Sequence, residues 1–184
     1  DLVVVVGDDL GEGRRRVTLE LTRAGGLLEA LGRHGVVPLP PYITTPLADP
    51  ERYQTTYALE PGSVAAPTAG LHLTPEVLQA AREAGATVAP VELVVGLGTF
   101  RPIATERVED HHMHAERYRV PSSTMTACEA ADRVVAIGTT TVRALESAAA
   151  TGALEGRTDL FIHGSRPFAM VDALVTNFHQ PRSS

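Results

Sequence analysis

The sequence contains no lysine and no tryptophan, a single cysteine, and few aromatic residues (4%). Without lysine, the chain cannot form a Schiff base or hold a phosphate with the lysine of a P-loop. The single Cys128 excludes an internal disulfide and a site built from several thiolates. The low aromatic content argues against a platform that stacks single-stranded bases. No apolar run reaches the roughly 18 residues of a membrane span, and no signal segment opens the chain, so we expect a cytoplasmic protein.

The charged residues that are present consist of arginine and the two acids. All 16 basic residues are arginine, and 22 acidic residues bring the net charge to −6. Anions must therefore be held by arginine, by backbone N–H groups or by hydroxyls, and the planar guanidinium suits carboxylates and phosphates. The acidic balance disfavours indiscriminate binding to nucleic acid but allows a local basic patch.

The pattern along the chain predicts an α+β protein with a mixed sheet. Residues 2–6 and 17–21 are typical of an antiparallel hairpin, and a short helix is expected over 27–34. Three prolines in residues 38–41 mark a boundary, so we expect a small β unit at 1–36 and a main body at 37–184. Further strands are expected at 87–95, 133–137, 160–162 and 171–176. Helices are expected at 74–84, 122–131 (capped by Ser122 or Ser123) and 141–150. Another helix is expected to begin at Asp49 and to place Tyr53 and Tyr57 on one face.

Two loops between these elements are rich in glycine and small residues. Residues 65–72 allow a ligand to approach the backbone, with Thr68, Gly70 and His72 as candidates, although a tight connection into the next helix is the alternative. Residues 95–102 include the candidates Gly98, Thr99 and Phe100. Because Pro102 blocks helix entry and the third glycine is missing, this is no dinucleotide fingerprint. It remains a glycine loop that could lie against a nucleoside or a sulfonium.

Residues 109–116 contain three histidines and three carboxylates, which can supply a general base and its orienting partner. His111 and His114 are the candidates, and we expect them in a loop with one ring pointing inward. A zinc site is the first alternative, but neighbours in one short segment rarely complete a tetrahedron, so we expect no metal. A merely solvated polar loop is the second.

Residues 137–147 lead from an apolar strand through Gly138, Thr139 and Thr140 into a helix N-terminus, where anions commonly bind. Arg143 lies one turn further and could reach the same ligand. The alternative is plain helix capping by threonine, with Arg143 and Glu146 as a surface pair. Asn177 and His179 follow the last predicted strand. Asn177 and Glu146 are further candidates for substrate binding, and His179 is a further candidate for catalysis.

These segments together resemble a known family. The matching motifs, in order, are PLPPYI at 38–43, YQT at 53–55, APTAGLH at 66–72, GTF at 98–100, EDH at 109–111 with MH at 113–114, GTT at 138–140 with VR at 142–143 and LES at 145–147, and VD at 171–172 with TNFH at 176–179. In this order the chain resembles S-adenosylmethionine:tRNA ribosyltransferase-isomerases of the queuosine pathway.

The resemblance implies a fold, a reaction and partners. It implies a mixed α/β body with a barrel-like sheet and an inserted small antiparallel β-barrel, of which residues 1–36 would be the tail, and a chain that lacks the family's N-terminal and C-terminal segments. The ribosyl unit of S-adenosylmethionine would be transferred to the aminomethyl group of a 7-deazaguanine in the tRNA anticodon and isomerised to epoxyqueuosine, with release of adenine and methionine. S-adenosylmethionine would be a consumed co-substrate, with no cofactor, and the protein a monomer that binds tRNA.

The motifs fit that chemistry. A sulfonium acidifies the neighbouring C5′ hydrogens, so His111 or His114 could act as the base. His72 or His179 could assist the departing adenine, and Arg143 with Thr139 and Thr140 could hold a carboxylate or phosphate. Two alternatives stay open: another S-adenosylmethionine-dependent transferase on the same scaffold, and a non-catalytic tRNA-binding fragment.

Overall fold

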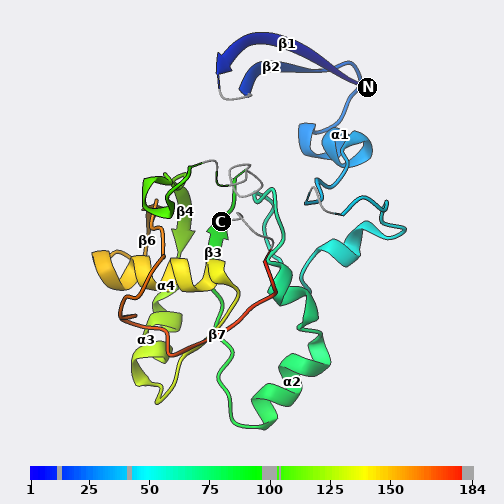
Figure 1. The fold of residues 1–184 in the computed structure, drawn as a ribbon. Coiled ribbons are helices and arrows are strands. Elements are labelled where there is room, and N and C mark those ends of the chain that lie inside the picture. Colours follow the sequence, from blue (N-terminus) through cyan, green and yellow to red (C-terminus); the bar gives the residue numbers. More distant parts are fainter. Residues whose placement is uncertain (12–13, 41–42, 97–102, 104, 180–184) are drawn as a thin grey trace. The chain divides into compact units, whose positions relative to one another are not determined.

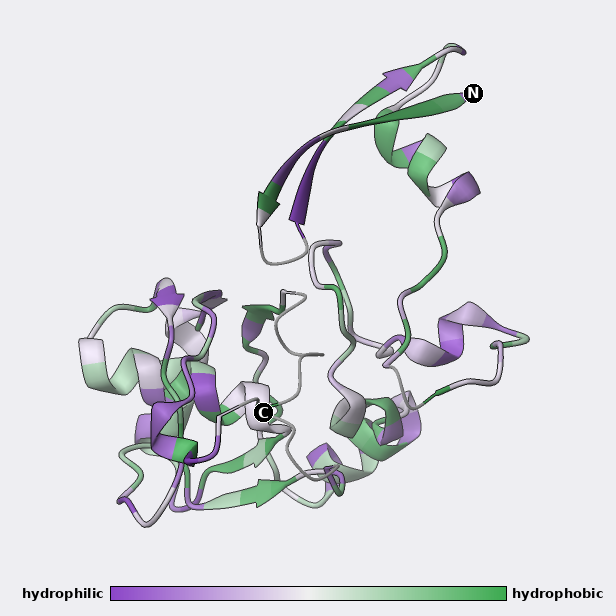
Figure 2. Cartoon of the chain, turned by 45° about the horizontal axis from the view of Figure 1, so that its top comes forward, coloured by the Kyte–Doolittle hydropathy of each residue, from purple (hydrophilic) through white to green (hydrophobic). Residues whose placement is uncertain are grey.

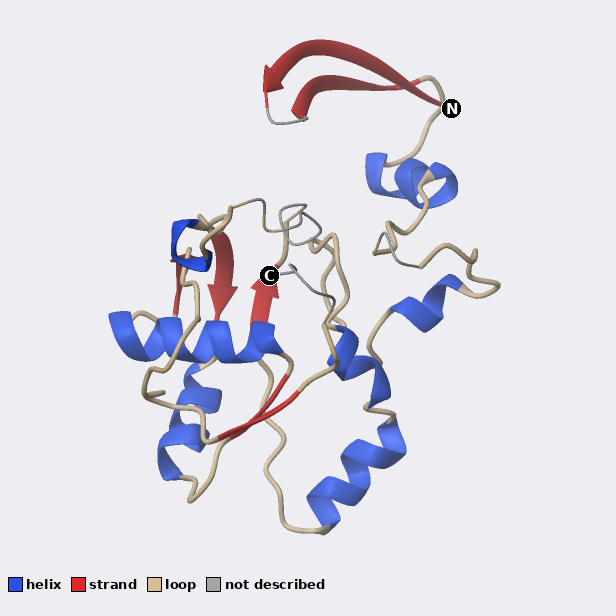
Figure 3. Cartoon of the chain, in the orientation of Figure 1, coloured by secondary structure: helices blue, strands red, loops and turns tan. Residues whose placement is uncertain are grey.

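The structure is a computed structural model that describes residues 1–11, 14–40, 43–96, 103 and 105–179. Contacts divide the chain into two units, Asp1–Pro38 and Leu39–Ser184, and the division falls inside the proline-rich segment. Each unit has its own secondary structure, drawn in chain order in Figure 1 and by type in Figure 3.

Unit 1, Asp1–Pro38, consists of an antiparallel hairpin and one short helix. β1 (Leu2–Gly11) pairs with β2 (Arg14–Leu21), and α1 (Leu27–His34) follows, as predicted. The strands extend beyond the predicted 2–6 and 17–21, because register shifts after Val6 and Asp9 accommodate the polar residues within the ladder. The valine run of β1, green in Figure 2, is largely exposed, with Val6 at 62%.

Unit 2, Leu39–Ser184, combines two small sheets with helices. An antiparallel sheet has the order β3 (Glu92–Val94), β4 (Glu116–Arg119), β6 (Glu155–Thr158), and β5 (Val135–Ile137) pairs in parallel with β7 (Ala173–Val175). The helices are η1 (Pro50–Tyr53), η2 (Thr68–His72), α2 (Pro75–Glu83), η4 (Val108–Asp110), α3 (Ser122–Ala130) and α4 (Thr139–Thr151). This mixture confirms the α+β prediction, and the described strands form open sheets with no closed barrel.

Helix α4 organises the core of unit 2. It contacts β3 and β6 of one sheet and β5 of the other, and runs across the middle of the unit in Figure 1. Its residues Ala144, Leu145 and Ala148 pack with Tyr118 and Val120, all at most 3% exposed. The buried face of α4 is therefore packed between the two sheets. Side chains from this helix reach loops that adjoin each sheet.

Several predicted elements need correction. The strand at 160–162 is wrong: the ladder ends at Thr158, whose hydroxyl accepts the N–H of Leu160, and the following residues have no regular structure. The strand at 87–95 is confined to Glu92–Val94, where β4 provides a partner. The predicted serine cap is also wrong, because α3 starts at Ser122 with Pro121 in the cap position and no side-chain cap.

The helix expected after Asp49 is a single 3-10 turn. The Asp49 carboxylate accepts the N–H of Glu51, and η1 ends at Tyr53, so Tyr57 does not share a helical face with it. In contrast, α2 begins as its sequence predicts, because the hydroxyl of Thr74 accepts the N–H of Val77 and Pro75 occupies the first turn.

The helices in the described part of the chain are all too short or too polar to cross a membrane.

Candidate functional site

The N-terminus of α4 lies against η2 and the end of β7. Gly138, with φ +89°, turns the chain from β5 into α4, a conformation that favours glycine. Its N–H donates to the carbonyl of Val175 at 2.8 Å, and a Cβ built on it would lie 3.7 Å from that of Ala69 in η2. The loops that follow β5 and β7 therefore meet η2 at the carboxyl ends of two parallel strands, the usual ligand position in such sheets.

Three segments that carry candidate residues meet here. Thr139 is exposed, while Thr140, Thr68 and Asn177 are half-buried. The capping alternative is wrong for this helix, because α4 has no side-chain cap and the hydroxyl of Thr141 donates back to the Ile137 carbonyl at 2.7 Å. The segments 65–72, 137–141 and 175–177 thus form one side of a candidate site.

Gly70 in η2 is closely approached by the side chains of Tyr57 and Thr55. A Cβ at this position would lie 2.0 Å from the hydroxyl oxygen of Tyr57 and 3.1 Å from the Thr55 methyl carbon. Burial raises the pKa of the Tyr57 phenol above its ordinary value, which keeps the hydroxyl protonated. His72 ends η2 and is exposed, so its ring is accessible at the surface.

Arg143 joins α4 to the histidine segment through a buried ion pair. Its guanidinium donates to the Glu116 carboxylate, to the His114 carbonyl at 2.9 Å and to the Thr158 carbonyl at 2.8 Å. The side chains of Arg143 and Glu116 are only 10% and 6% exposed. The other Glu116 oxygen accepts the N–H of Gly96 at 3.1 Å. Segments 95–96, 114–116 and 158 are therefore tied to one helix.

Glu146 anchors the loop before β7. Its carboxylate accepts backbone N–H groups from Ala169 (2.8 Å), Met170 (2.9 Å) and Val171 (3.1 Å), and the residue is 3% exposed. The alternative of an Arg143–Glu146 surface pair is wrong, because both side chains are buried and bind different partners.

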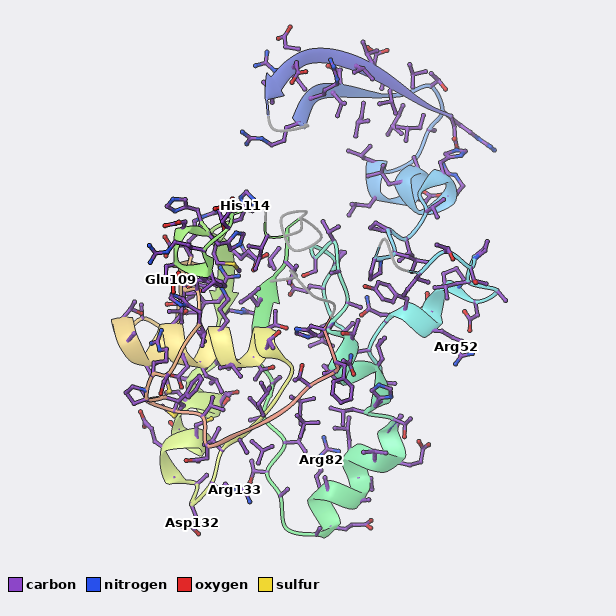
Figure 4. All side chains as sticks on the ribbon, in the orientation of Figure 1. Arg52, Arg82, Glu109, His114, Asp132 and Arg133 are labelled. Atoms are coloured by element: carbon purple, nitrogen blue, oxygen red, sulfur yellow. The ribbon has the colours of Figure 1, made fainter. Side chains whose placement is uncertain are left out.

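The candidate histidines lie in different surroundings. The segment after η4 has no regular structure, as predicted, and His111 is the inward residue, half-buried with its ring 5.2 Å from that of Phe161. His114 is exposed and lies at the end of the unit where β4 begins (Figure 4). His179 is also exposed. Within the part of the chain that the structure describes, no ring contact joins any two of His72, His111, His114 and His179.

Two further predictions concern the glycine loop and a metal site. Gly98, Thr99 and Phe100 lie outside the described residues, next to Gly96. Within the described ranges, no three His, Cys, Asp or Glu side chains are grouped in a way that could hold a metal ion. The site that can be built therefore consists of loops at the N-terminal half of α4.

The comparison with protein families matches residues 2–184 to a family described as "Queuosine biosynthesis protein". The chain belongs to this family. The match extends through every segment that carries the candidate residues, including those of η2, the histidine segment and α4.

Individual relatives from the family agree with this assignment. The chain is 55% identical over 180 residues to the S-adenosylmethionine:tRNA ribosyltransferase-isomerase of Rubrobacter xylanophilus, covering 97% of this chain and 52% of that protein. It is 54% identical to the enzyme of that name from Solibacter usitatus (91% and 48%) and 48% identical to that of Nostoc sp. (98% and 47%). The chain thus spans about half the length of these relatives. No solved structure matches it.

Sequence reasoning missed the partners that hold this family's motifs in place. Glu116 was included in the acidic cluster without a role, and Thr158 and Asp172 were not singled out as structural anchors. Asp172 accepts the N–H of Val134 at 2.7 Å and so fixes the start of β5. One signal was available: Glu116 alternates in phase with Tyr118, which places both on the buried face of β4.

Proposed function

We propose that the protein containing this chain is an S-adenosylmethionine:tRNA ribosyltransferase-isomerase. The ribosyl unit of S-adenosylmethionine is transferred to the amine of a 7-aminomethyl-7-deazaguanine in a tRNA anticodon and rearranged to epoxyqueuosine. One bond forms between the amine nitrogen and the ribosyl unit, a carbon–carbon bond closes the carbocycle, and the ring oxygen shifts to form the epoxide. The bonds to adenine and to sulfur break, adenine leaves with a proton, and methionine leaves as the neutral thioether. The reaction is redox-neutral, so no redox cofactor is required and S-adenosylmethionine is consumed.

The observation that carries this proposal is the match of residues 2–184 to the family, together with relatives of that printed name at 48% to 55% identity. The geometry adds a supporting argument. The proposed reaction needs a base, hydrogen-bond donors for adenine and a place for a carboxylate, and the described loops around α4 carry histidines, hydroxyls and an amide.

Within the proposed mechanism, the first step removes a C5′ proton that the adjacent sulfonium has acidified. His114 is the favoured base, because its ring is exposed while its backbone carbonyl is held by Arg143. His111 is the alternative, with its ring against Phe161. The attacking amine must be neutral, and a histidine can take up protons near neutral pH.

The remaining candidates lie on the other loops. His72 or His179 would donate to the departing adenine, while Thr139, Thr140 and Asn177 would bind the polar parts of S-adenosylmethionine beside Thr68. Gly98, Thr99 and Phe100 would complete the glycine loop that follows Gly96. Both terminal nitrogens of Arg143 are engaged with protein groups, and its buried Nε, which has no partner among the described residues, is the nitrogen left for a direct anion contact.

The domain assignment belongs to the same proposal. Residues 1–36 would be the tail of an inserted small β-barrel and residues 37–184 the catalytic body, whose sheets would be part of a larger barrel-like sheet. A monomer in the cytoplasm is the simplest form of such an enzyme. Both statements rest on the family resemblance rather than on any contact described above.

The test uses the complete protein as it is made in the cell, incubated with S-adenosylmethionine and tRNA that carries the aminomethyl-deazaguanine. Release of adenine and methionine in equal amounts, dependent on the modified tRNA, is expected. Unmodified tRNA is the control substrate and should give none. Formation of S-adenosylhomocysteine instead would identify a methyltransferase, and tight tRNA binding without adenine release would identify a non-catalytic binding protein.

A further inference from the structure

The buried ion pair between Arg143 and Glu116 contacts two segments that carry candidate residues. Arg143 donates to the carbonyl of His114, and Glu116 accepts the N–H of Gly96, where the glycine loop begins. Three stretches that are far apart in the sequence meet here: Gly96 just after β3, His114 with Glu116 where β4 begins, and Arg143 in α4. One pair of charges therefore sets the position of one segment relative to the other.

We propose that Glu116 and Arg143 are positioning residues that hold the Gly96 backbone and the His114 backbone in register for the reaction. This inference rests on the proposed function and adds a role that differs from direct anion binding. Arg143 uses its two terminal nitrogens on Glu116, His114 and Thr158, all of them protein groups. The terminal nitrogens of Arg143 therefore stabilise the fold of the site, and the loops that Arg143 holds would make the contacts with the ligand.

The burial of the pair makes the coupling strong. With side-chain exposures of 10% and 6%, neither charge can exchange its partner for bulk water at low cost. A planar guanidinium that donates in several directions is also hard to replace, since lysine provides a point charge without the fork. A displacement of a reacting group by about 1 Å can lower a rate by about 10²-fold, so a small shift at His114 is sufficient to impair catalysis.

The experiment compares Glu116→Gln, Arg143→Lys and the double variant that combines these two changes, all in the complete protein. Gly96 and Arg143 donate to different oxygens of Glu116, and in the Glu116→Gln variant one of these positions becomes an NH₂ donor that faces an N–H donor. We expect kcat for adenine release to fall by about 10²-fold in each single variant. The KM for S-adenosylmethionine should stay within a factor of about three, and the double variant should be no worse than the poorer single variant, because both changes remove one coupled unit.

A matched control separates positioning from general loss of stability. The Thr124 hydroxyl is buried and donates to the Pro90 carbonyl at 2.7 Å, in a contact that involves neither candidate segment. Thr124→Val should lower the melting temperature and leave kcat per folded molecule unchanged. Activities are therefore normalised to the folded fraction of each variant at the assay temperature.

A second readout does not depend on activity. Hydrogen exchange of the complete protein, followed in peptides that contain Gly96 and His114, should accelerate in both peptides for Glu116→Gln and for Arg143→Lys, and in neither for Thr124→Val. If the parent protein releases no adenine, the proposed function fails, while the exchange result still decides whether the pair couples the two segments.

Three outcomes would overturn the positioning role. Arg143→Lys could raise the KM for S-adenosylmethionine with kcat unchanged while Glu116→Gln has no effect, which identifies an anion clamp. The losses in the double variant could be the product of the single losses, which indicates independent residues. Exchange could accelerate in only one of the two peptides, which means that the pair does not connect them.

Discussion

Arg143 and Arg157 donate to the carbonyls of two consecutive residues, His114 at 2.9 Å and Ala115 at 2.7 Å. Arg143 is buried in the core and Arg157 is exposed on β6. The backbone that enters β4 directly after the histidine segment is therefore held by two guanidinium groups, and the position of the His114 ring follows from a fixed main chain.

His114 and His111 should respond differently to alanine substitution. If His114 is the general base, His114→Ala lowers kcat by about 10²- to 10⁴-fold with a melting temperature close to that of the parent. His111→Ala removes a ring packed against Phe161 and should mainly lower the melting temperature. Exposed His112 is the matched control. The profile of kcat against pH decides: loss of the limb between about pH 5 and 8 in His111→Ala, but not in His114→Ala, would reverse the assignment.

Glu146 should matter for stability through its three N–H contacts. In Glu146→Gln, an amide NH₂ replaces one carboxylate oxygen and faces backbone donors, so at least one of the N–H groups of Ala169 to Val171 loses its acceptor. We expect a loss of about 1–3 kcal/mol in the free energy of unfolding, measured by urea denaturation. Glu129→Gln, an exposed change on α3, should have almost no effect. Equal stability of the two variants would contradict the anchoring role.

Gly70→Ala should destabilise the protein because its Cβ collides with Tyr57 and Thr55. The expected cost is about 1–3 kcal/mol, as for other overpacked sites. Tyr57→Ala in the same protein removes the nearest atoms and should restore part of the lost stability, so the two changes are not additive. A double variant that is as unstable as the sum of the single changes would show that strain in η2 has another origin.

The phenol of Tyr57 should make stability sensitive to alkaline pH. Burial raises its pKa above the ordinary 10.0, so the native state binds this proton more tightly than the unfolded state. Its contribution is fully present below pH 10 and is lost as pH rises through the higher native pKa. Tyr57→Phe should therefore flatten the fall of the melting temperature above about pH 10. An unchanged slope would exclude Tyr57 as the source.

Cys128 should react slowly with thiol reagents. Burial raises the pKa of this thiol, and the negative charge of Glu129 raises it further, so little thiolate is present near neutral pH. We expect alkylation by iodoacetamide at pH 8 to be several-fold slower in the native protein than in urea. Glu129→Gln should speed the native reaction slightly. Equal rates in the native and denatured states would indicate an exposed thiol.

The helices with chemical start signals could be predicted from the sequence. Thr74 followed by Pro75 fixes the start of α2, and glycines at 25–26 and at 35 bound α1. The strands were less predictable, because a strand needs a partner as well as a propensity. The apolar residues 160–162 form no strand, whereas the polar sequence of β6 does, since it lies opposite β4.

The loops that meet at the N-terminus of α4 could be singled out from the sequence, but the contacts that hold them could not. The glycine at 138, the threonines after it and Asn177 were found from motif and position, and the structure brings their segments together. The contact between Arg143 and Glu116 was not visible, because it joins residues that are distant in sequence. Only tertiary packing decides whether such an arginine faces a ligand, solvent or a carboxylate.

The parallel pairing of β5 with β7 has a consequence for the order of folding. During synthesis the ribosome delivers β5 first, and β7 follows only after α4 and β6 have emerged. Closing the long loop between β5 and β7 costs chain entropy, and no local contact offsets this cost early in folding. The pair must therefore form late. Until then the apolar edge of β5 is open to other chains, and a nascent protein stalled between residues 137 and 173 would be prone to aggregate.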